Sequence, residues 1–230
     1  LAVLVWLMLN YKKDLIDQCS YDDTQKQPHR FSQVLKNKQS WVIALYACLL
    51  WAPMSGFASL WGVPFLQTVY HFSQHDAALV CSLMWLGLAL ASPFLGWIST
   101  MTGSRVWPLS LSALLGSLAF GALIAFHMSP VIAAILVFLS GAACSGQALS
   151  FTSVKEMNTS RQQATAIAFN NMAVVISGAI VQPLLGRMLD FHGHAAHHYR
   201  MSMIVVLAVY VLAFLVAAFF IRESVKKASV

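Results

Sequence analysis

Apolar and polar residues follow one another along this chain in long blocks. A short apolar block covers residues 1–9, and a polar stretch follows it. Six longer apolar blocks come next, at about 41–69, 77–98, 106–127, 130–150, 163–189 and 200–221. A helix needs about 20 apolar residues to cross a bilayer. The pattern therefore predicts six membrane-spanning helices, because the blocks are too long to be the strands of a membrane barrel.

The short apolar block and the polar stretch indicate how the chain is organised. Residues 1–9 are too short to span a bilayer and lack the basic start and cleavage site of a signal peptide. We interpret them as the end of a preceding transmembrane helix. Residues 10–40 are rich in Lys, Asp, Gln and Ser and predict a central loop with some amphipathic helix. The six-helix bundle then covers 41–222, and residues 223–230 form a tail.

Composition and charge indicate whether the protein folds in water or in a membrane. Apolar residues make up 59% of the chain, charged residues make up 10%, and the mean hydropathy is +0.70. A soluble domain carries roughly 25% charged residues, so the partner that the composition implies is the lipid bilayer. The net charge of +6 is not arranged as a basic face with interleaved aromatic residues, so no nucleic-acid partner is expected.

The placement of the basic residues predicts the orientation. If the 10–40 loop is cytoplasmic, twelve of the fourteen Lys and Arg residues lie on the cytoplasmic side, and only Arg187 and Arg200 lie on the opposite side. We therefore predict an integral multi-pass protein of the bacterial cytoplasmic (inner) membrane, with its C-terminus in the cytoplasm.

A weak internal repeat relates the two halves of the bundle. When the chain is shifted by ninety residues, Pro93-Phe-Leu-Gly96 lies on Pro183-Leu-Leu-Gly186. Each copy ends the second span of a three-span set, and an odd number of spans between the copies makes the two sets face opposite ways. The sets cover about 41–127 and 130–222. Inverted three-helix repeats are typical of secondary transporters.

Residues 96–105, Gly-Trp-Ile-Ser-Thr-Met-Thr-Gly-Ser-Arg, resemble a loop of the major facilitator superfamily with the pattern G-x-x-x-D-x-x-G-x-R. Gly96, Gly103 and Arg105 match this pattern. Thr100 stands in place of the aspartate. The charge relay that this loop forms in the family is therefore not expected here in its usual form.

The resemblance covers essentially the whole chain and includes shorter similar stretches at 60–66, 155–171 and 221–224. It implies an all-α polytopic membrane protein: a six-helix bundle made of two inverted three-helix repeats, which is half of a twelve-helix major facilitator fold. The chain would supply the end of helix six, the central loop and helices seven to twelve, and the missing N-terminal half of the same protein would be its partner. The implied activity is secondary active transport of a small polar metabolite, such as an amino acid or similar nutrient, by alternating access.

Polar residues inside the spans are the candidates for the substrate pathway, because a polar group in a bilayer needs water, substrate or a partner helix. Asn170 and Asn171 can each donate and accept hydrogen bonds, and the alternative for them is an interhelical hydrogen bond. Gln147 and Ser145 form a second candidate pair, for which helix packing is the alternative. The span that holds the two asparagines also carries Thr165, Ser177 and Gln182.

The first long block carries a predicted hinge. Pro53 lacks a backbone N–H and kinks a helix, and Gly56 adds conformational freedom. Ser55 lies between them, and Trp51 and Trp61 flank the segment. An indole there could stack on a ligand, pack in the core or lie at the membrane interface. We predict Ser55, Trp51 and Trp61 as pathway residues. The predicted hinge and gating residues are Pro53, Gly56, Gly96, Gly103 and Arg105.

Acidic residues are absent from the middle of the predicted spans, since all eight lie in loops or at helix ends. A coupling proton would then be carried by the missing half, and sodium coupling and uniport stay open. Between the last two spans, His194, His197 and His198 would share one face of a helix and could bind a metal ion. A solvated loop is the favoured alternative, so no metal site is predicted.

No enzyme motif accompanies these features: the chain has no glycine-rich phosphate loop, no H-E-x-x-H and no nucleophile motif. We therefore predict that it is not an enzyme and that it needs no cofactor. The alternative to a transporter is a non-transporting membrane receptor or assembly subunit with the same fold. A membrane enzyme ranks third. Saturable flux with substrate competition separates a transporter from a receptor.

Overall fold

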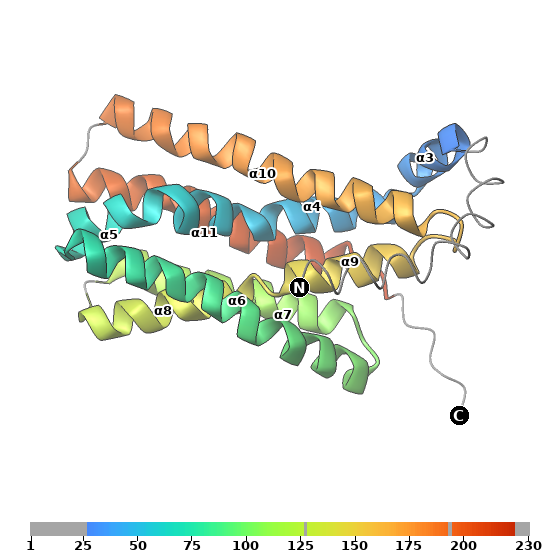
Figure 1. Ribbon diagram of the computed structural model, residues 1–230, viewed down its shortest axis with the longest axis horizontal. Helices are drawn as coiled ribbons and strands as arrows, with labels where there is room; N and C mark the ends of the chain where they lie inside the picture. The colour runs from blue at the N-terminus through green and yellow to red at the C-terminus, as the bar shows by residue number, and fades with distance from the viewer. Residues whose placement is uncertain (1–26, 127, 193–194, 224–230) are drawn as a thin grey trace, which may run out of the picture.

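The computed structural model describes residues 27–126, 128–192 and 195–223, and every regular element in these ranges is a helix (Figure 1). The predicted end of a preceding helix (1–9), most of the central loop and residues 224–230 lie outside the described residues. The helices are α3 (Gln27–Lys36), α4 (Lys38–Pro53), η2 (Met54–Trp61), α5 (Gly62–Tyr70), α6 (Gln74–Thr102), α7 (Val106–Ala125), α8 (Pro130–Ala143), α9 (Gly146–Glu156), α10 (Gln163–His192) and α11 (Ala196–Phe219).

Six helices in the described part of the chain are long and apolar enough to cross a membrane. The first consists of α4, η2 and α5, and the fourth consists of α8 and α9; α6, α7, α10 and α11 are the others. This confirms the all-α, six-helix prediction. The helices run further than the apolar blocks, and the fourth ends at Glu156, where the sequence predicted a break from about residue 151. Its polar end is helical, and the hydroxyl of Ser153 donates there to the carbonyl of Leu149 one turn earlier (3.2 Å).

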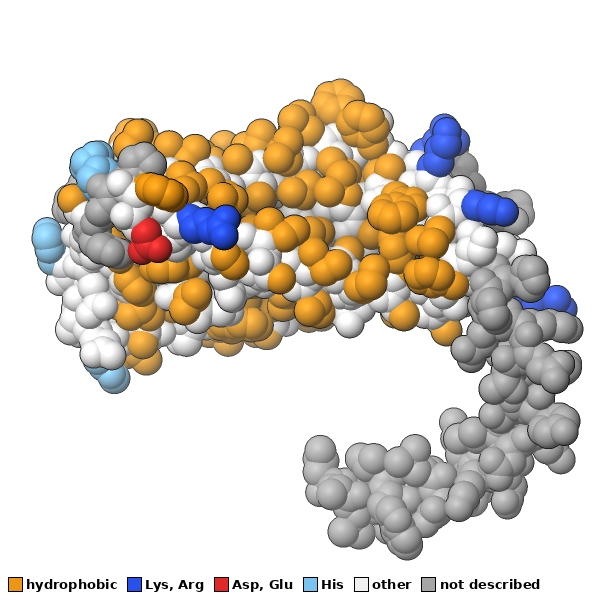
Figure 2. Space-filling view, turned by 90° about the horizontal axis from the view of Figure 1, so that it is seen from above, with side chains coloured by type: hydrophobic (Ala, Val, Ile, Leu, Met, Phe, Trp, Pro, Cys, Tyr) orange, Lys and Arg blue, Asp and Glu red, His pale blue; other side chains and the backbone are white. Residues whose placement is uncertain are grey.

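The spanning helices lie along the long axis of the molecule, so the connections between them lie at its two ends (Figure 1). We call the end that contains Lys38, Gly103 and Glu156 the linker end, and the end that contains Tyr70 and Phe126 the far end. On the face drawn in Figure 2, hydrophobic side chains cover the middle, while Lys and Arg gather mainly at the linker end and His at the far end. An apolar middle between polar ends is what a bilayer-spanning bundle requires.

The two three-helix sets pack against each other through equivalent helix pairs, as an inverted repeat requires. In the first set, α4 packs against α10 of the second set, and in the second set α8 packs against α6 of the first. The third helices of the two sets, α7 and α11, pack against each other. The sets also start at opposite ends of the bundle, α4 at the linker end and α8 at the far end (Figure 1).

Both sets interrupt their first helix at the same register. α4 ends at Pro53 and continues as the π-helical segment η2, and α8 ends at Ala143, ninety residues later. This separation equals the shift of the internal repeat. Pro53 has no N–H to donate. At the second break the N–H of Cys144 donates to the carbonyl of Gly141 (3.0 Å), a tighter 3₁₀-type bond.

Glycines allow α6 and α8 to touch through their backbones. Gly141 of α8 faces the carbonyl of Met84, and Gly87 of α6 faces the carbonyl of Phe138. At both positions an added Cβ would overlap the carbonyl oxygen. Membrane helices associate through such small residues because lipid supplies no hydrophobic force between helices.

Candidate functional site

The predicted hinge lies where the first spanning helix is π-helical. Pro53 is buried at the end of α4, and η2 carries Ser55 and Gly56 against α10. A Cβ added to Gly56 would lie 2.7 Å from Cγ1 of Val181, and one added to Gly178 would lie 3.3 Å from Cβ of Ser55. Glycine on each side therefore brings the interrupted helix close to α10. Single π-helical turns inside longer helices are frequent at functional sites.

Gln182 of α10 joins the hinge segment by hydrogen bonds in both directions. Its side-chain Nε2 donates to the backbone carbonyl of Ser55 (2.9 Å). The backbone carbonyl of Gln182 accepts from Nε1 of Trp61 (3.2 Å). The hydroxyl of Ser59 donates to the carbonyl of Met54 (2.9 Å). Side chains thus satisfy carbonyls in a segment where the regular α-helical pattern is lost. Two predicted pathway residues, Ser55 and Trp61, belong to this group.

The two adjacent asparagines of α10 have different surroundings. Asn170 is fully buried, and its Nδ2 donates to the hydroxyl of Ser150 on α9 (2.9 Å). Its Oδ1 has no hydrogen-bond partner among the described residues. Asn171 is exposed. Asn170 therefore makes the interhelical hydrogen bond that was the alternative to substrate contact, while Asn171 presents a free amide on the surface of this bundle.

The second candidate pair lies at the break between α8 and α9. Ser145 precedes the first residue of α9 and is buried. Gln147 is also buried, and its carbonyl accepts from the hydroxyl of Ser150 (2.6 Å), which links this pair to the Asn170 contact. Trp51 packs edge-to-face against Trp85 of α6, with ring centroids 6.0 Å apart.

The structure therefore brings six of the seven predicted pathway residues into three contact groups and leaves Asn171 outside them. Ser55 and Trp61 meet at Gln182, Asn170 meets the α8–α9 break at Ser150, and Trp51 meets Trp85. Three of the partners, Gln182, Ser150 and Trp85, were not predicted as site residues. Gln182 carried a usable signal, because it is an amide inside a spanning block eleven residues after Asn171, or about three helical turns.

The loop at 96–105 forms an ionic cluster in spite of Thr100. Arg105 makes a two-point ion pair with Glu156 of α9 (Nη2 to Oε1 2.7 Å, Nε to Oε2 3.1 Å), and its Nη1 donates to Ser99 (2.7 Å). Glu223, beyond α11, accepts from the backbone N–H of Arg105 (2.6 Å). The loop thus obtains its carboxylates from α9 and from the segment that follows α11. The sequence analysis did not predict Glu156 or Glu223 as partners of this loop, although both lie at the linker end, as Arg105 does.

The two glycines of this loop have separate places in it. Gly103 ends α6 with φ +60°, a left-handed conformation that favours glycine. Gly96 lies inside α6, and no atom lies within 4 Å of a Cβ added there. Thr100 does not reach the ionic cluster, since its hydroxyl donates to the carbonyl of Gly96 (3.0 Å). Only Gly103 is therefore required by the backbone geometry of the turn.

The histidines at the far end form no metal centre among the described residues. The rings of His197 and His198 lie 3.7 Å apart between centroids. His194 lies outside the described residues, so the predicted histidine face is not tested.

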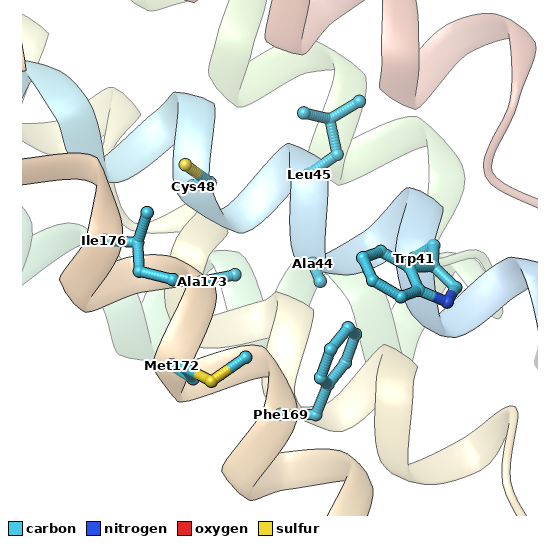
Figure 3. Close-up of a pocket in the computed structure, with 8 residues that line it drawn as sticks. All are labelled: Trp41, Ala44, Leu45, Cys48, Phe169, Met172, Ala173 and Ile176. Atoms are coloured by element: carbon cyan, nitrogen blue, oxygen red, sulfur yellow. The ribbon is translucent and has the colours of Figure 1, made fainter. Parts of the chain in front are cut away.

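An apolar groove of about 200 Å³ runs between α4 and α10 (Figure 3). The rings of Trp41 and Phe169 meet at one end of it, with centroids 4.9 Å apart. It offers a polar metabolite almost no hydrogen-bonding group, so it differs from the polar contacts described above. Its lining residues are Trp41, Ala44, Leu45, Cys48, Phe169, Met172, Ala173 and Ile176.

Comparison with known protein families identifies the family of this chain. A family model described as Major Facilitator Superfamily matches residues 43–230, from the second turn of α4 to the end of the chain. No curated protein matches the chain significantly.

Proposed function

This chain belongs to the Major Facilitator Superfamily, a family of membrane transporters, and from that membership we propose that it forms half of a secondary transporter that moves a small polar metabolite by alternating access. An amino acid or a similar nutrient is the substrate class that we favour. The proposed substrate site lies near the middle of the membrane, between this bundle and an N-terminal bundle of the same protein.

The observation that carries this proposal is the interrupted first helix and its polar partner on α10. The π-helical segment η2 and the amide of Gln182 lie inside two long and predominantly apolar helices. Polar groups at membrane depth are costly unless they bind water, substrate or another helix, and transporters build their sites from interrupted helices. Bending at Pro53 would change which groups of Ser55, Trp61 and Gln182 face the substrate.

The ionic cluster at the linker end supports movement of the bundle as one body. Arg105, Glu156 and Glu223 join α7, α9 and the end of α11. We propose that this end faces the cytoplasm of a bacterium, because the excess of basic residues lies there.

If transport by this protein is coupled to an ion, we propose a proton or sodium as that ion. The acids of the described residues, Asp76, Asp190, Glu156 and Glu223, lie at or beyond the ends of the spanning helices. We therefore propose that a carboxylate of the N-terminal half carries any coupled proton. In this half, Asn171, Gln147 and Ser145 are the further groups that we assign to the pathway.

Uptake into liposomes tests the proposal. The full-length protein is reconstituted and supplied with labelled amino acids, nucleosides and small organic acids, with and without a proton or sodium gradient. We expect saturable uptake of one class, competed by the unlabelled compound and abolished when the coupling gradient is removed.

Other outcomes point to other functions. Saturable flux that no gradient affects identifies a facilitator. Absence of flux for every solute, in a preparation that is folded and inserted, contradicts transport and favours a receptor or assembly subunit.

A further inference from the structure

The α4–α10 groove is an apolar surface feature that the proposed pathway does not use. Trp41, Leu45 and Met172 line it and remain between 48% and 53% exposed. Figure 3 shows that the lining side chains come from these two helices only. An apolar groove on the outside of a spanning helix pair meets either lipid chains or another protein surface.

We propose that this groove holds one acyl chain of an anionic phospholipid, whose headgroup lies against basic residues at the linker end. The inference requires that the bundle spans a bilayer, but it does not require transport. It can therefore fail while the proposed function stands.

The length of the groove along the helices is similar to the thickness of one membrane leaflet. From Trp41 to Cys48 it covers about 10 Å along the helix, at about 1.5 Å per residue. Trp41 lies one turn after Lys38, the first residue of α4. One leaflet contributes about half of the roughly 30 Å hydrocarbon core. The groove thus begins just inside the headgroup region and follows most of one leaflet, as a lipid chain does.

Basic residues surround the mouth of the groove. Lys38 lies on the same helical stripe as Trp41 and Leu45, at spacings of three and seven residues. Lys36 ends α3, and Arg161 lies two residues before α10. All three basic side chains are exposed, and none forms an ion pair with a described residue.

The two acids that the structure describes at the same end already have hydrogen-bond or ion-pair partners. Glu156 pairs with Arg105, and Glu223 accepts from the backbone of the same residue. No acid of the described residues therefore pairs with the lysines or with Arg161, and we assign their charge to an external anion. Each Lys or Arg near an anionic membrane surface contributes about 1 kcal/mol of attraction.

Trp41 connects the two parts of the proposed site. Its ring forms a wall of the groove, while its Nε1 donates to the carbonyl of Leu35 in α3 (2.8 Å). An indole with an apolar body and a hydrogen-bonded edge is typical of the headgroup level of a membrane. A second apolar helix would match the walls of the groove but would leave the cations unmatched, so we assign the groove to lipid.

Native mass spectrometry of the full chain in detergent tests this site. The probes are phosphatidylglycerol and phosphatidylcholine with identical acyl chains. We expect one phosphatidylglycerol to be retained in preference to phosphatidylcholine. The double variant Lys36→Gln/Lys38→Gln should weaken phosphatidylglycerol binding about thirtyfold, because two contributions of about 1 kcal/mol are lost. Ala173→Phe, which fills the groove, should abolish the preference.

Matched variants show whether the effect belongs to the groove. Lys155→Gln removes an exposed charge from α9 at the same end, and Ala168→Phe adds a ring to an exposed position of α10 outside the groove. Both should bind phosphatidylglycerol as the parent protein does. Equal losses in Lys155→Gln and Lys38→Gln, or equal binding of the two lipids by the parent protein, would overturn the proposal. So would absence of retained lipid together with a change of oligomeric mass in Ala173→Phe, which would show that protein covers the groove.

Discussion

At the scale of single residues, Gln182 is the side chain on which the hinge segment most directly depends. Its amide donates to the Ser55 carbonyl within a π-helical segment. We predict that Gln182→Leu lowers the free energy of unfolding by about 1 kcal/mol, because a hydrogen bond between membrane helices is worth about that much. Denaturant titration of both proteins in detergent measures this difference in the free energy of unfolding.

A control for Gln182→Leu is available on the first spanning helix, which carries Ser55. Gln67→Leu changes a half-buried glutamine of α5 for which no side-chain hydrogen bond is observed within the described residues. It should leave the stability within about 0.5 kcal/mol. Equal destabilisation by both variants would mean that the hydrogen bond between Gln182 and Ser55 does not measurably stabilise the protein.

Asn170 and Asn171 allow the two interpretations of a membrane asparagine to be compared in adjacent residues. We predict that Asn171→Ala raises the KM for the transported solute about tenfold, which corresponds to the loss of one hydrogen bond of about 1.4 kcal/mol. The free energy of unfolding of Asn171→Ala should equal that of the parent protein, because the side chain is exposed. Asn170→Ala should instead lower stability by about 1 kcal/mol, because the Ser150 hydroxyl loses its donor. An unchanged KM for Asn171→Ala contradicts the assignment.

The sequence identified polar residues at membrane depth, and their partners depended on the fold. Asn170 and Ser55 stand out because amides and hydroxyls are rare in apolar blocks. Gln182 and Ser55 are 127 residues apart, and Arg105 and Glu156 are 51 apart. Pairing over such separations is decided by the packing of α10 on η2 and of α9 near α7, which no local pattern contains.

At the scale of helices, the contact between α6 and α8 depends on glycine. We predict that Gly141→Ala lowers the free energy of unfolding by about 2 kcal/mol, because the added Cβ meets the Met84 carbonyl and forces the helices apart. Gly96→Ala is the matched change within α6, where an added Cβ meets nothing within 4 Å. It should stabilise the protein by up to about 1 kcal/mol, since alanine favours a helix more than glycine does. Similar effects of the two variants would contradict this account of the packing.

The boundaries of the helices were predictable where hydrophobicity alone decides them. The six apolar blocks became six helices, and Pro53 marked the place where the first of them changes its geometry. The end of α9 was not predictable in the same way. Its serines look like loop residues in the sequence, but they lie within the helix, where their hydroxyls bond to carbonyls of the preceding turn.

At the scale of the whole molecule, polar contacts at the linker end join the two three-helix sets. Asn37 caps α4 and also donates to the carbonyl of Met157 after α9 (2.9 Å). Gln39 donates to the carbonyl of Phe220 at the end of α11 (3.1 Å). Together with the Arg105–Glu156 pair, these contacts connect both sets at one end, so a force on any one of these helices is passed to the others.

The Arg105–Glu156 ion pair should be a measurable part of this connection. The two side chains are only 14% and 30% exposed, so solvent screens the pair less than an ordinary surface pair. We predict a coupling energy of about 1 kcal/mol in a double-mutant cycle of Arg105→Gln and Glu156→Gln, measured by unfolding in detergent. The coupling should shrink at about 1 M salt, where the Debye length is near 3 Å. Lys155→Gln, beside Glu156, should show no coupling to Arg105→Gln. If the two changes at Arg105 and Glu156 add independently, the connection between the sets rests on the Asn37 and Gln39 contacts instead.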